Sequence, residues 1–516
     1  MKLFRLLRVM RMIGWLSPAA LFRLVNAIYR SGVNLLALLR FAAETYGDRT
    51  ALADEQGAYS YRELYVRTNK LAALFQGEYG LSRERRAAVV CKNSAALMQT
   101  IVAVSSSGAD ICLLNPEMSG DQLRDMVVDL APDLIIYDEE YRMKMEQIGC
   151  SCPSLLRVQE IEGIVRTRRI LTRFRPSPSG KLVLLTGGTT GKPKQAAHRP
   201  SLFHYLNPFV DFVVRLKIKD AHAAYIATPL YHGYGLAVAI LCFVLGMKVV
   251  LQRGFDALKA CQLVREHQVE LMNVVPSMLY KMLKADADAL TSLKCIACGG
   301  AELSPKLAEE TLNRLGNVLY NLYGTSESGL NFIATPEDLR HNLRTIGHPL
   351  TGVRVRIMDA HDQPAATGEI GRIHVRNEWS AADHNEQWLD TGDLGYVDRD
   401  GYYCLCGRAD SMIVSGGENV YPLEVEQILL THPLIEDAAA IAVPDEVFGQ
   451  RLKIVVVPGC DADVALSEEA LRGWLRDRLA RYQMPREIEF VDELPYTPLG
   501  KLDRKKLGEI GREYRR

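Results

Sequence analysis

The chain has 516 residues, more than one hydrophobic core usually serves, so we expect at least two domains. Hydrophobic residues make up 48% and charged residues 24% of the composition, as is typical of a globular protein. Lysine plus arginine and aspartate plus glutamate number 62 each, so the overall charge argues against nucleic acid as a partner, and any charged site must be local.

The N-terminal segment is basic. Residues 1–43 contain lysine and arginine but no acidic residue. Arg5, Arg8 and Arg11 recur at helical spacing beside apolar residues, which predicts a basic amphipathic segment over residues 1–40. Arginines interrupt the apolar run too often for a membrane span. Peripheral contact with an anionic membrane and docking on its own domain are two open alternatives.

The 11 cysteines do not follow the spacing of a zinc site or a disulfide framework. Cys295 and Cys298 leave a redox pair or a metal half-site open as an alternative to buried free thiols. Free thiols persist in reducing compartments, so we expect a cytoplasmic protein.

Short apolar runs alternate with helical patterns through most of the chain. Strands are predicted at 87–91, 133–137, 182–185 and 247–251, with helices at 61–76 and 257–267. This alternation predicts an α/β fold whose large N-terminal domain, residues 41–409, consists of α/β subdomains with mainly parallel sheets.

The pattern changes after residues 372–375 to short strands and turns, with a hairpin turn at 398–403. This β-rich part completes the large domain. Beyond it, the chain predicts a small, mobile α+β C-terminal domain, residues 410–516, whose expected elements are a helix at 422–431, strands at 438–443 and 453–457, and a helix at 466–479. We place the boundary near Asp410.

The stretch LLTGGTTGKPK, residues 184–194, follows a predicted strand. A P-loop would have glycine at Thr186 and a hydroxyl side chain at Pro193, so the magnesium ligand of a P-loop is missing. Its glycines, hydroxyls and lysines still suit a polyphosphate whose Mg²⁺ is held elsewhere, and a plain surface loop is the alternative. The candidate phosphate-binding residues are Thr186, Gly187, Gly188, Thr189, Thr190, Gly191, Lys192 and Lys194.

Three further motifs follow in order: YNLYGTSESG at 320–329, LDTGDLG at 389–395 and YTPLGK at 496–501. Together with the loop they resemble the adenylate-forming superfamily of acyl-CoA synthetases, peptide-synthetase adenylation domains and luciferases. The resemblance runs from about residue 41 to 507. It implies an AMP-forming acid–thiol ligase that uses ATP, Mg²⁺ and coenzyme A: a carboxylate attacks the α-phosphate of ATP, and a thiol then displaces AMP from the acyl adenylate.

The resemblance also implies catalytic roles. Lys501 would bridge the carboxylate and the transferring phosphate and stabilise their developing charge. Glu327 would bind Mg²⁺, and the hydroxyl of Ser326, where the family usually has threonine, would donate to the α-phosphate. His232 matches the usual histidine of the acyl pocket.

Nucleotide contacts follow from the same resemblance. Tyr323 would stack on adenine, Asp393 would accept hydrogen bonds from the ribose hydroxyls, and Arg408 would donate to them. Structural alternatives are a core aromatic for Tyr323, a surface ion pair for Asp393 with Arg408, and a helix N-terminal charge for Glu327. The remaining candidates for nucleotide binding are Gly300, Ala301, Glu302, Asn321, Gly324 and Thr325.

Asp410 matches the family's hinge, about which the small domain would rotate between the two half-reactions. Gly416 and Gly417 resemble the variant found in CoA-using members and would let a pantetheine arm pass close to the backbone. A plain helix-entry loop is the alternative there. Among departures from the family, Gly187 replaces a serine, which we expect to weaken phosphate binding by about 1 kcal/mol.

The run from Leu236 to Leu245 is wholly apolar, and no aspartate occurs between Pro229 and Gly246 to pair with an α-ammonium group. We therefore predict an apolar acid, a medium- or long-chain fatty acid first and an aryl acid second; a buried helix that never meets substrate is the alternative. An acyl-AMP ligase that loads a carrier protein, a luciferase-like oxygenase and a non-catalytic scaffold are the rival functions.

Overall fold

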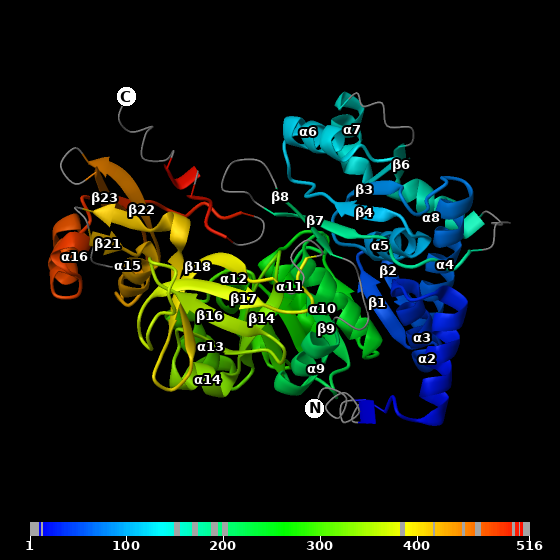
Figure 1. The fold of residues 1–516 in the computed structure, drawn as a ribbon, viewed down its shortest axis with the longest axis horizontal. Coiled ribbons are helices and arrows are strands. Elements are labelled where there is room, and N and C mark those ends of the chain that lie inside the picture. Colours follow the sequence, from blue (N-terminus) through cyan, green and yellow to red (C-terminus); the bar gives the residue numbers. More distant parts are fainter. Residues whose placement is uncertain are drawn as a thin grey trace.

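The computed structural model describes residues 10–11, 14–148, 155–167, 174–186, 194–198, 205–381, 387–415, 418–445, 449–459, 466–497, 501–504 and 506–508. The large domain lies beside the N-terminal helices, and the small domain lies at the opposite end of the molecule (Figure 1). The first nine residues of the predicted basic segment fall outside these ranges.

The largest sheet has 13 strands within the described residues. Their order across the sheet is β16 (Arg354–Met358), β17 (Gly371–Arg376), β18 (Leu389–Val397), β19 (Tyr403–Arg408), β15 (Thr345–Pro349), β14 (Gly329–Ala334), β13 (Leu319–Thr325), β12 (Cys295–Gly299), β11 (Leu271–Val274), β9 (Ala223–Ile226), β10 (Lys248–Leu251), β1 (Thr50–Asp54) and β2 (Gly57–Ser60). The strands from β13 to β1 pair in parallel. Those from β14 to β19 pair antiparallel, so the β-rich part begins at Gly329, earlier than the change of pattern after residues 372–375 predicted.

A second sheet has six strands in the described part of the chain. Their order is β6 (Leu155–Arg157), β5 (Leu134–Tyr137), β3 (Arg86–Val90), β4 (Asp110–Leu113), β7 (Leu182–Thr186) and β8 (Lys194–His198). All pairs are parallel except β7 with β8. The antiparallel pair carries the ends of the predicted phosphate loop, because Thr186 pairs with Lys194.

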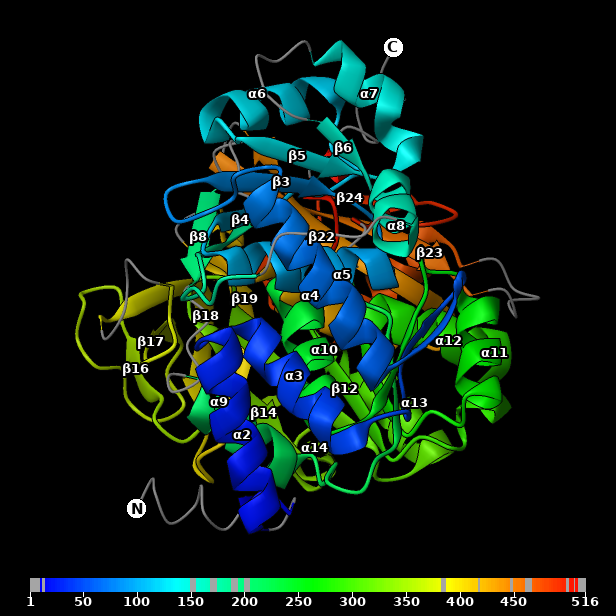
Figure 2. The same cartoon turned by 90° about the vertical axis from the view of Figure 1, so that its right-hand side faces the viewer.

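Helices pack on both faces of these sheets. Figure 2 shows α4 and α5 between the two sheets, and every residue of α5 is buried. The main core of the large domain lies here and continues into α3 and α10. The helices of the large domain are α2 (Pro18–Ser31), α3 (Leu35–Tyr46), α4 (Tyr61–Gly77), α5 (Ala95–Ser107), α6 (Gly120–Leu130), α7 (Arg142–Gln147), α8 (Val158–Thr167), α9 (Leu206–Arg215), α10 (Gly233–Val244), α11 (Ala257–Glu266), α12 (Pro276–Asp286), α13 (Pro305–Leu315) and α14 (Pro336–His341).

Local sequence signals explain several helix starts. Ser60 and Glu63 form a capping box at α4, with Ser60 Oγ accepting from the Glu63 N–H at 3.1 Å. Pro305 opens α13 directly after the N-cap Ser304. No helix in the described ranges is long and apolar enough to cross a membrane.

The small domain has its own sheet and core. Its strands are β20 (Ile413–Ser415), β21 (Glu418–Val420), β22 (Ile435–Asp445), β23 (Gly449–Pro458) and β24 (Glu487–Phe490), and its helices are α15 (Pro422–Leu429) and α16 (Glu468–Arg476). Both helices pack their buried leucines against the sheet. The predicted α/β fold, with a large N-terminal and a smaller C-terminal domain, is confirmed.

Candidate active site

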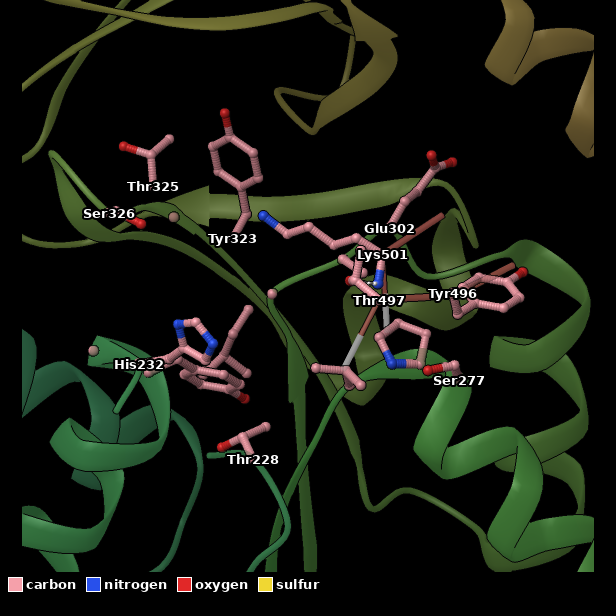
Figure 3. A pocket seen from close by; sticks show the side chains of 18 of the residues that line it. Thr228, His232, Ser277, Glu302, Tyr323, Thr325, Ser326, Tyr496, Thr497 and Lys501 are labelled. Carbon is pink, nitrogen blue, oxygen red and sulfur yellow. Dashed lines mark hydrogen bonds between the residues drawn. The ribbon is translucent and has the colours of Figure 1, made fainter. Parts of the chain in front are cut away.

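A cleft of about 3250 Å³ lies between the large and the small domain. Figure 3 shows Lys501 extending across it toward the segment that carries Tyr323 and Ser326, with His232 below that segment. The predicted residues that line the cleft are Gly300, Ala301, Glu302, Tyr323, Gly324, Thr325, Ser326, Glu327, Asp393, Arg408, Asp410, His232 and Lys501.

The turn that follows β13, residues 325–329, is held from behind by buried amides. Asn377 Nδ2 donates to the Ser328 carbonyl oxygen at 2.9 Å, and both residues are buried. Because this turn is fixed from the core side, the side chains of Ser326 and Glu327 remain at the cleft surface. The turn therefore presents a hydroxyl and a carboxylate side by side to whatever enters.

Not every residue of the predicted binding motif reaches the cleft. Asn321 is buried and donates from Nδ2 to the Thr345 carbonyl oxygen at 3.1 Å, so it ties β13 to β15 instead. Gly324 lines the cleft and is also needed for packing, because a Cβ atom there would lie 2.3 Å from the Gly329 carbonyl oxygen. The motif thus combines residues that face the cleft with residues that shape the strand.

Asp393 connects two of the predicted nucleotide contacts. The Tyr323 hydroxyl donates to Asp393 Oδ2 at 2.6 Å, and Arg408 donates to Asp393 Oδ1 at 3.1 Å. Burial raises the pKa of Asp393, although both hydrogen bonds favour its charged form. The ring of Tyr323 packs on Phe332 at a centroid distance of 5.7 Å, so Tyr323 is both a core aromatic and part of the cleft wall.

The backbone of Lys501 is hydrogen-bonded to Thr497 of the small domain. Its backbone N–H donates to Thr497 Oγ1 at 3.2 Å, and its carbonyl oxygen accepts from the Thr497 N–H at 2.8 Å. The neighbouring Tyr496 hydroxyl donates to Asp437 Oδ2 at 2.7 Å, which anchors Tyr496 to β22. The ammonium group therefore extends from a backbone position that is bonded within the small domain.

The charge of Lys501 is tuned by its surroundings. Enclosure by protein lowers its pKa, the carboxylates of Asp393 and Glu327 oppose that shift, and Arg408 adds to it. A partly desolvated cation attracts phosphate and carboxylate oxygens more strongly than a cation in water. This position suits a lysine that must hold two anions together.

His232 N-caps α10 without using its side chain as a cap. Burial, with the nearby Lys501 charge second, lowers the pKa of the imidazole to about 3, so the ring is neutral at physiological pH. Its buried Nε2 atom has no hydrogen-bond partner among the described residues. A neutral ring beside Lys501 can contact an acyl group and its carboxylate without adding charge.

Glu302 faces the small domain. Gln427 Nε2 of α15 donates to Glu302 Oε1 at 2.9 Å. Burial, assisted by the carboxylate of Glu426, raises the pKa of Glu302 to about 8, while the Gln427 hydrogen bond opposes the shift. The glycine before it, Gly300, has a left-handed φ of +82° that favours glycine. Sequence reasoning placed Glu302 against the nucleotide; the structure shows that it also contacts the small domain.

Part of the predicted phosphate loop lies outside the described residues: Gly187, Gly188, Thr189, Thr190, Gly191 and Lys192. Its flanks are described as strands, with Thr186 at the end of β7 and Lys194 at the start of β8. Gly416 and Gly417 also fall outside the described ranges. The roles of these residues stay predictions.

His198 at the end of β8 is a residue that sequence reasoning missed. Its Nε2 atom lies 2.7 Å from the Ser326 carbonyl oxygen, and the Tyr205 hydroxyl lies 3.1 Å from Nδ1. Burial lowers the pKa of this imidazole. His198 thus connects the strand beyond the phosphate loop to the turn that carries Ser326 and Glu327. The two partners are 128 positions apart, and no local pattern predicts the contact.

Asp410 lies in the short 3₁₀ turn Ala409–Ser411 between the two domains. Its carboxylate accepts from Arg408 Nε at 3.4 Å. The turn joins β19 of the large domain to β20 of the small domain, where a hinge is required. The hinge role itself stays a prediction.

An apolar arm of the cleft extends toward the N-terminal helices. Helix α10 contributes Leu236, Ile240 and Leu241 to its lining while its other face is packed in the core. Whether this run meets the acyl group stays a prediction. The remaining apolar lining residues come from α2, α3, α9 and the segment before them: Trp15, Leu24, Leu35, Leu38, Phe209 and Phe212.

The described donors fit a magnesium nucleotide. Glu327 supplies a carboxylate oxygen, the ligand type that Mg²⁺ prefers, next to the Ser326 hydroxyl. No cluster of three or more potential metal ligands occurs among the described residues. A Mg²⁺ ion that keeps waters and phosphate oxygens as ligands needs only one or two carboxylates. Glu327 would hold this ion, and the ion would neutralise phosphate charge there.

Family comparisons agree with this geometry. The family model for AMP-binding enzymes matches residues 39–382, and the model for the AMP-binding enzyme C-terminal domain matches residues 424–501. A 2-succinylbenzoate–CoA ligase from Geobacillus kaustophilus is 31% identical over 491 residues, covering 90% of this chain and 95% of that protein. A 2-succinylbenzoate–CoA ligase from Bacillus velezensis is 28% identical, covering 91% and 96%.

Solved structures extend the similarity to the whole fold. An o-succinylbenzoate CoA synthetase from Bacillus subtilis, in complex with an acyl-adenylate intermediate, superposes with a TM-score of 0.80 at 26% identity and covers 91% of this chain and 97% of its own. An amide bond synthetase from Marinactinospora thermotolerans has a TM-score of 0.80 at 26% identity and covers 92% and 99%. The chain therefore belongs to the AMP-binding enzyme family, within the adenylate-forming superfamily that its motifs resemble.

Proposed function

We propose that this protein is an AMP-forming acyl-CoA ligase that activates an apolar carboxylic acid bearing an aromatic ring. The observation that carries the proposal is the position of Lys501, which reaches between the Ser326–Glu327 turn and His232 at the mouth of the apolar arm. One cation is thus close both to the predicted phosphate site and to the predicted acyl site.

In the first half-reaction, a carboxylate oxygen of the acid forms a bond to the α-phosphorus of ATP, and the bond from that phosphorus to pyrophosphate breaks. Lys501 binds both anions and offsets their repulsion. Asp393 and Arg408 orient the ribose, and Ser326 donates to a phosphate oxygen. The neutral His232 holds the carboxyl end of the acid without competing for the lysine charge.

In the second half-reaction, the CoA thiolate attacks the acyl carbon, and AMP leaves with the shared oxygen. Lys501 has no role in this step and stands where the thiol must approach. We therefore infer that the small domain rotates about Asp410 between the two steps. Gly416 and Gly417 would then lie along the pantetheine arm.

The proposed acid follows from the relatives together with the cavity. Three of the relatives named above, from Geobacillus kaustophilus, Bacillus velezensis and Bacillus subtilis, are succinylbenzoate–CoA ligases, whose acid is aromatic, and they do not favour the fatty acid predicted first from the sequence. The apolar arm is lined by Trp15, Phe209 and Phe212, rings that suit an aromatic acid. A fatty acid would fill the same arm and is the second candidate.

The test is pyrophosphate release and thioester formation with aromatic acids, medium- and long-chain fatty acids and 2-succinylbenzoate, each with and without CoA. We expect turnover with aromatic acids to require CoA and to yield the acyl-CoA by mass spectrometry. Turnover only with fatty acids would show that the substrate is a fatty acid and not an aromatic acid. A single equivalent of pyrophosphate regardless of CoA would indicate a carrier-protein acceptor instead, and no release with any acid would refute the ligase.

A variant inside the arm separates acid recognition from catalysis. Ile240→Trp adds volume at the arm without touching the nucleotide site. We expect it to lower kcat/KM for the preferred acid by about tenfold or more while leaving the KM for ATP unchanged. Unchanged kcat/KM for every acid would show that this arm does not hold the acyl group.

A further inference from the structure

Helix α2 carries an apolar face that is exposed although the helix is part of the folded domain. Phe22 is 72%, Val25 66% and Tyr29 84% exposed, and Leu21 is 40% exposed. With Pro18 at the start of the helix, these positions recur every three or four residues and therefore form one stripe. We call this stripe the α2 apolar face. Isolated exposed apolar residues are ordinary, but a continuous stripe with two large aromatic rings is not.

The opposite side of α2 is packed on its own domain. Ala20, Ala27 and Ser31 are buried there, and α2 contacts α3 along its length. Figures 1 and 2 show α2 at the edge of the molecule, on the side away from the small domain. Helix α2 is therefore already packed on its own domain through its opposite side. The α2 apolar face is a surface of the folded domain and points outward.

Basic residues predominate around this helix, and the acidic Glu44 of α3 accepts from Asn26 of α2 and pairs with Arg40. The whole segment 1–43 has no acidic residue, while it contains Lys2, Arg5, Arg8, Arg11, Arg23, Arg30 and Arg40. Arg30 is exposed beside the stripe, and its Nε donates to Asn26 Oδ1 at 3.2 Å. Basic residues beside an apolar stripe with aromatic rings match the composition of helices that lie in the interface of an anionic bilayer.

The position of α2 next to the apolar arm adds a second argument, which rests on the proposed function. Leu24 of α2 lines the arm from the inside, while Phe22 and Val25 face outward from the same turns. One helix therefore separates the end of the proposed acyl site from the outer surface. An apolar acid dissolves preferentially in a bilayer, so a bilayer against α2 would hold such an acid within one helix diameter of its site.

We propose that the α2 apolar face docks this protein on the surface of an anionic lipid membrane. Phe22, Val25 and Tyr29 enter the headgroup boundary, and the exposed Arg30 beside them contacts the anionic headgroups. The binding is peripheral and reversible, since a single amphipathic helix face buries too little area for permanent anchoring. Because surface charge contributes, added salt weakens it.

The test is cosedimentation of the full chain with vesicles of phosphatidylcholine, with and without phosphatidylglycerol. We expect binding to the phosphatidylglycerol vesicles, weakened by salt, and a loss of about tenfold or more in the combined variant Phe22→Ser, Val25→Ser, Tyr29→Ser. The matched control is Val128→Ser with Met143→Ser on α6 and α7, where the side chains are 67% and 73% exposed. The control should bind as the wild type does.

Three results would overturn the proposal: wild-type protein that stays in the supernatant with both vesicle types, an unweakened triple variant, or a control variant that is weakened as much. Light scattering tests whether a second copy of this chain binds the α2 apolar face instead. A wild-type dimer that the triple variant converts to monomers would show that the face binds a second copy of this chain, which also refutes membrane docking.

Vesicle binding needs neither ATP nor an acid, so its outcome is separable from that of the ligase proposal. Thermal unfolding of the triple variant at the wild-type temperature shows that the fold is intact. Vesicle binding without turnover on any acid would refute the ligase proposal and support membrane docking. Turnover without vesicle binding would support the ligase proposal and refute membrane docking.

Discussion

The two walls of the cleft differ in how they are attached to the rest of the molecule. On the large-domain side, the turn 325–329 continues a strand in the middle of a sheet, and the buried side chains of Asn331 and Asn377 hold it from behind. On the small-domain side, the backbone of Lys501 is bonded to Thr497 of its own domain, while its ammonium group interacts with the charges of Asp393 and Glu327 of the large domain.

The interface between the two domains includes several polar contacts. Besides the contact of Gln427 with Glu302, Lys306 Nζ donates to the Ile435 carbonyl oxygen at 2.8 Å, and the Tyr280 hydroxyl donates to Glu436. Polar contacts of this kind re-form with water at little net cost when domains separate. From this comparison we infer a rigid wall that would position the nucleotide and a removable wall that would supply the charge.

The largest expected effect comes from removing that charge. Lys501→Ala should reduce acyl adenylate formation by about a thousandfold, because one preorganised cation in a partly dry site contributes several kcal/mol to the transition state. Thioester formation from prepared acyl adenylate should stay near wild type. Pyrophosphate exchange and single-turnover thioester assays measure the two steps. Lys506→Ala, another exposed lysine at the cleft, is the control, and an equal loss in both half-reactions would contradict the removable wall.

A change in the rigid wall should affect binding more than chemistry. Asp393→Asn removes the charge that accepts from Tyr323 and Arg408 and should raise the KM for ATP by about tenfold to a hundredfold. Asp390→Asn, in the same turn, should leave it nearly unchanged. A loss confined to kcat with an unaltered KM would place Asp393 outside nucleotide binding.

Glu302 should make the interface sensitive to pH. Its pKa is raised to about 8 from an ordinary 4.5, so the joined domains bind a proton that the separated domains release. The stabilisation of the joined state is therefore complete below about pH 4.5 and is lost as pH rises through 8. We expect adenylation to fall severalfold over this rise in wild type and to fall less in Glu302→Gln. Identical pH profiles would exclude this role.

The smallest effect is expected at the edge of the interface. Tyr280→Phe removes one hydroxyl that donates to Glu436 and should slow adenylation by about threefold, with no change in thioester formation. Stopped-flow measurement of pyrophosphate release resolves a change of this size. Tyr482→Phe, an exposed tyrosine of the small domain, serves as the control. Faster adenylation in Tyr280→Phe would mean that this contact holds the domains in an unproductive arrangement.

Much of this site could be predicted from sequence motifs, because its residues are grouped on short turns. Ser326 and Glu327 share one turn, and Asp393 directly follows Gly392 in the motif at 389–395. A local pattern therefore suffices to find them. The order of the elements was also readable: the predicted strands at 87–91 and 247–251 correspond to β3 and β10. The α-helix predicted over 466–479 is shorter, because Ser467 caps α16 and the helix ends at Arg476.

Contacts between distant segments could not be read in this way. His198 supports Ser326, and Gln427 meets Glu302, across more than a hundred positions in each case. Such pairs depend on how sheets and domains pack, which single-residue patterns do not encode. Asn321 shows the converse: its place in a motif suggested the nucleotide, whereas its side chain bonds to the neighbouring strand.

Trp15 gives the apolar arm a natural optical probe. It lines the arm, stacks on Phe209 at a centroid distance of 5.9 Å and meets Phe41 edge-on at 5.0 Å. Of the other three tryptophans, Trp379 also lines the cleft, Trp474 belongs to the small domain and Trp388 lies against Arg356. Indole emission depends on the polarity around the ring, so an acid that fills the arm should change the fluorescence of Trp15 without any added label. The acid can then be titrated in the absence of ATP, before any chemistry begins.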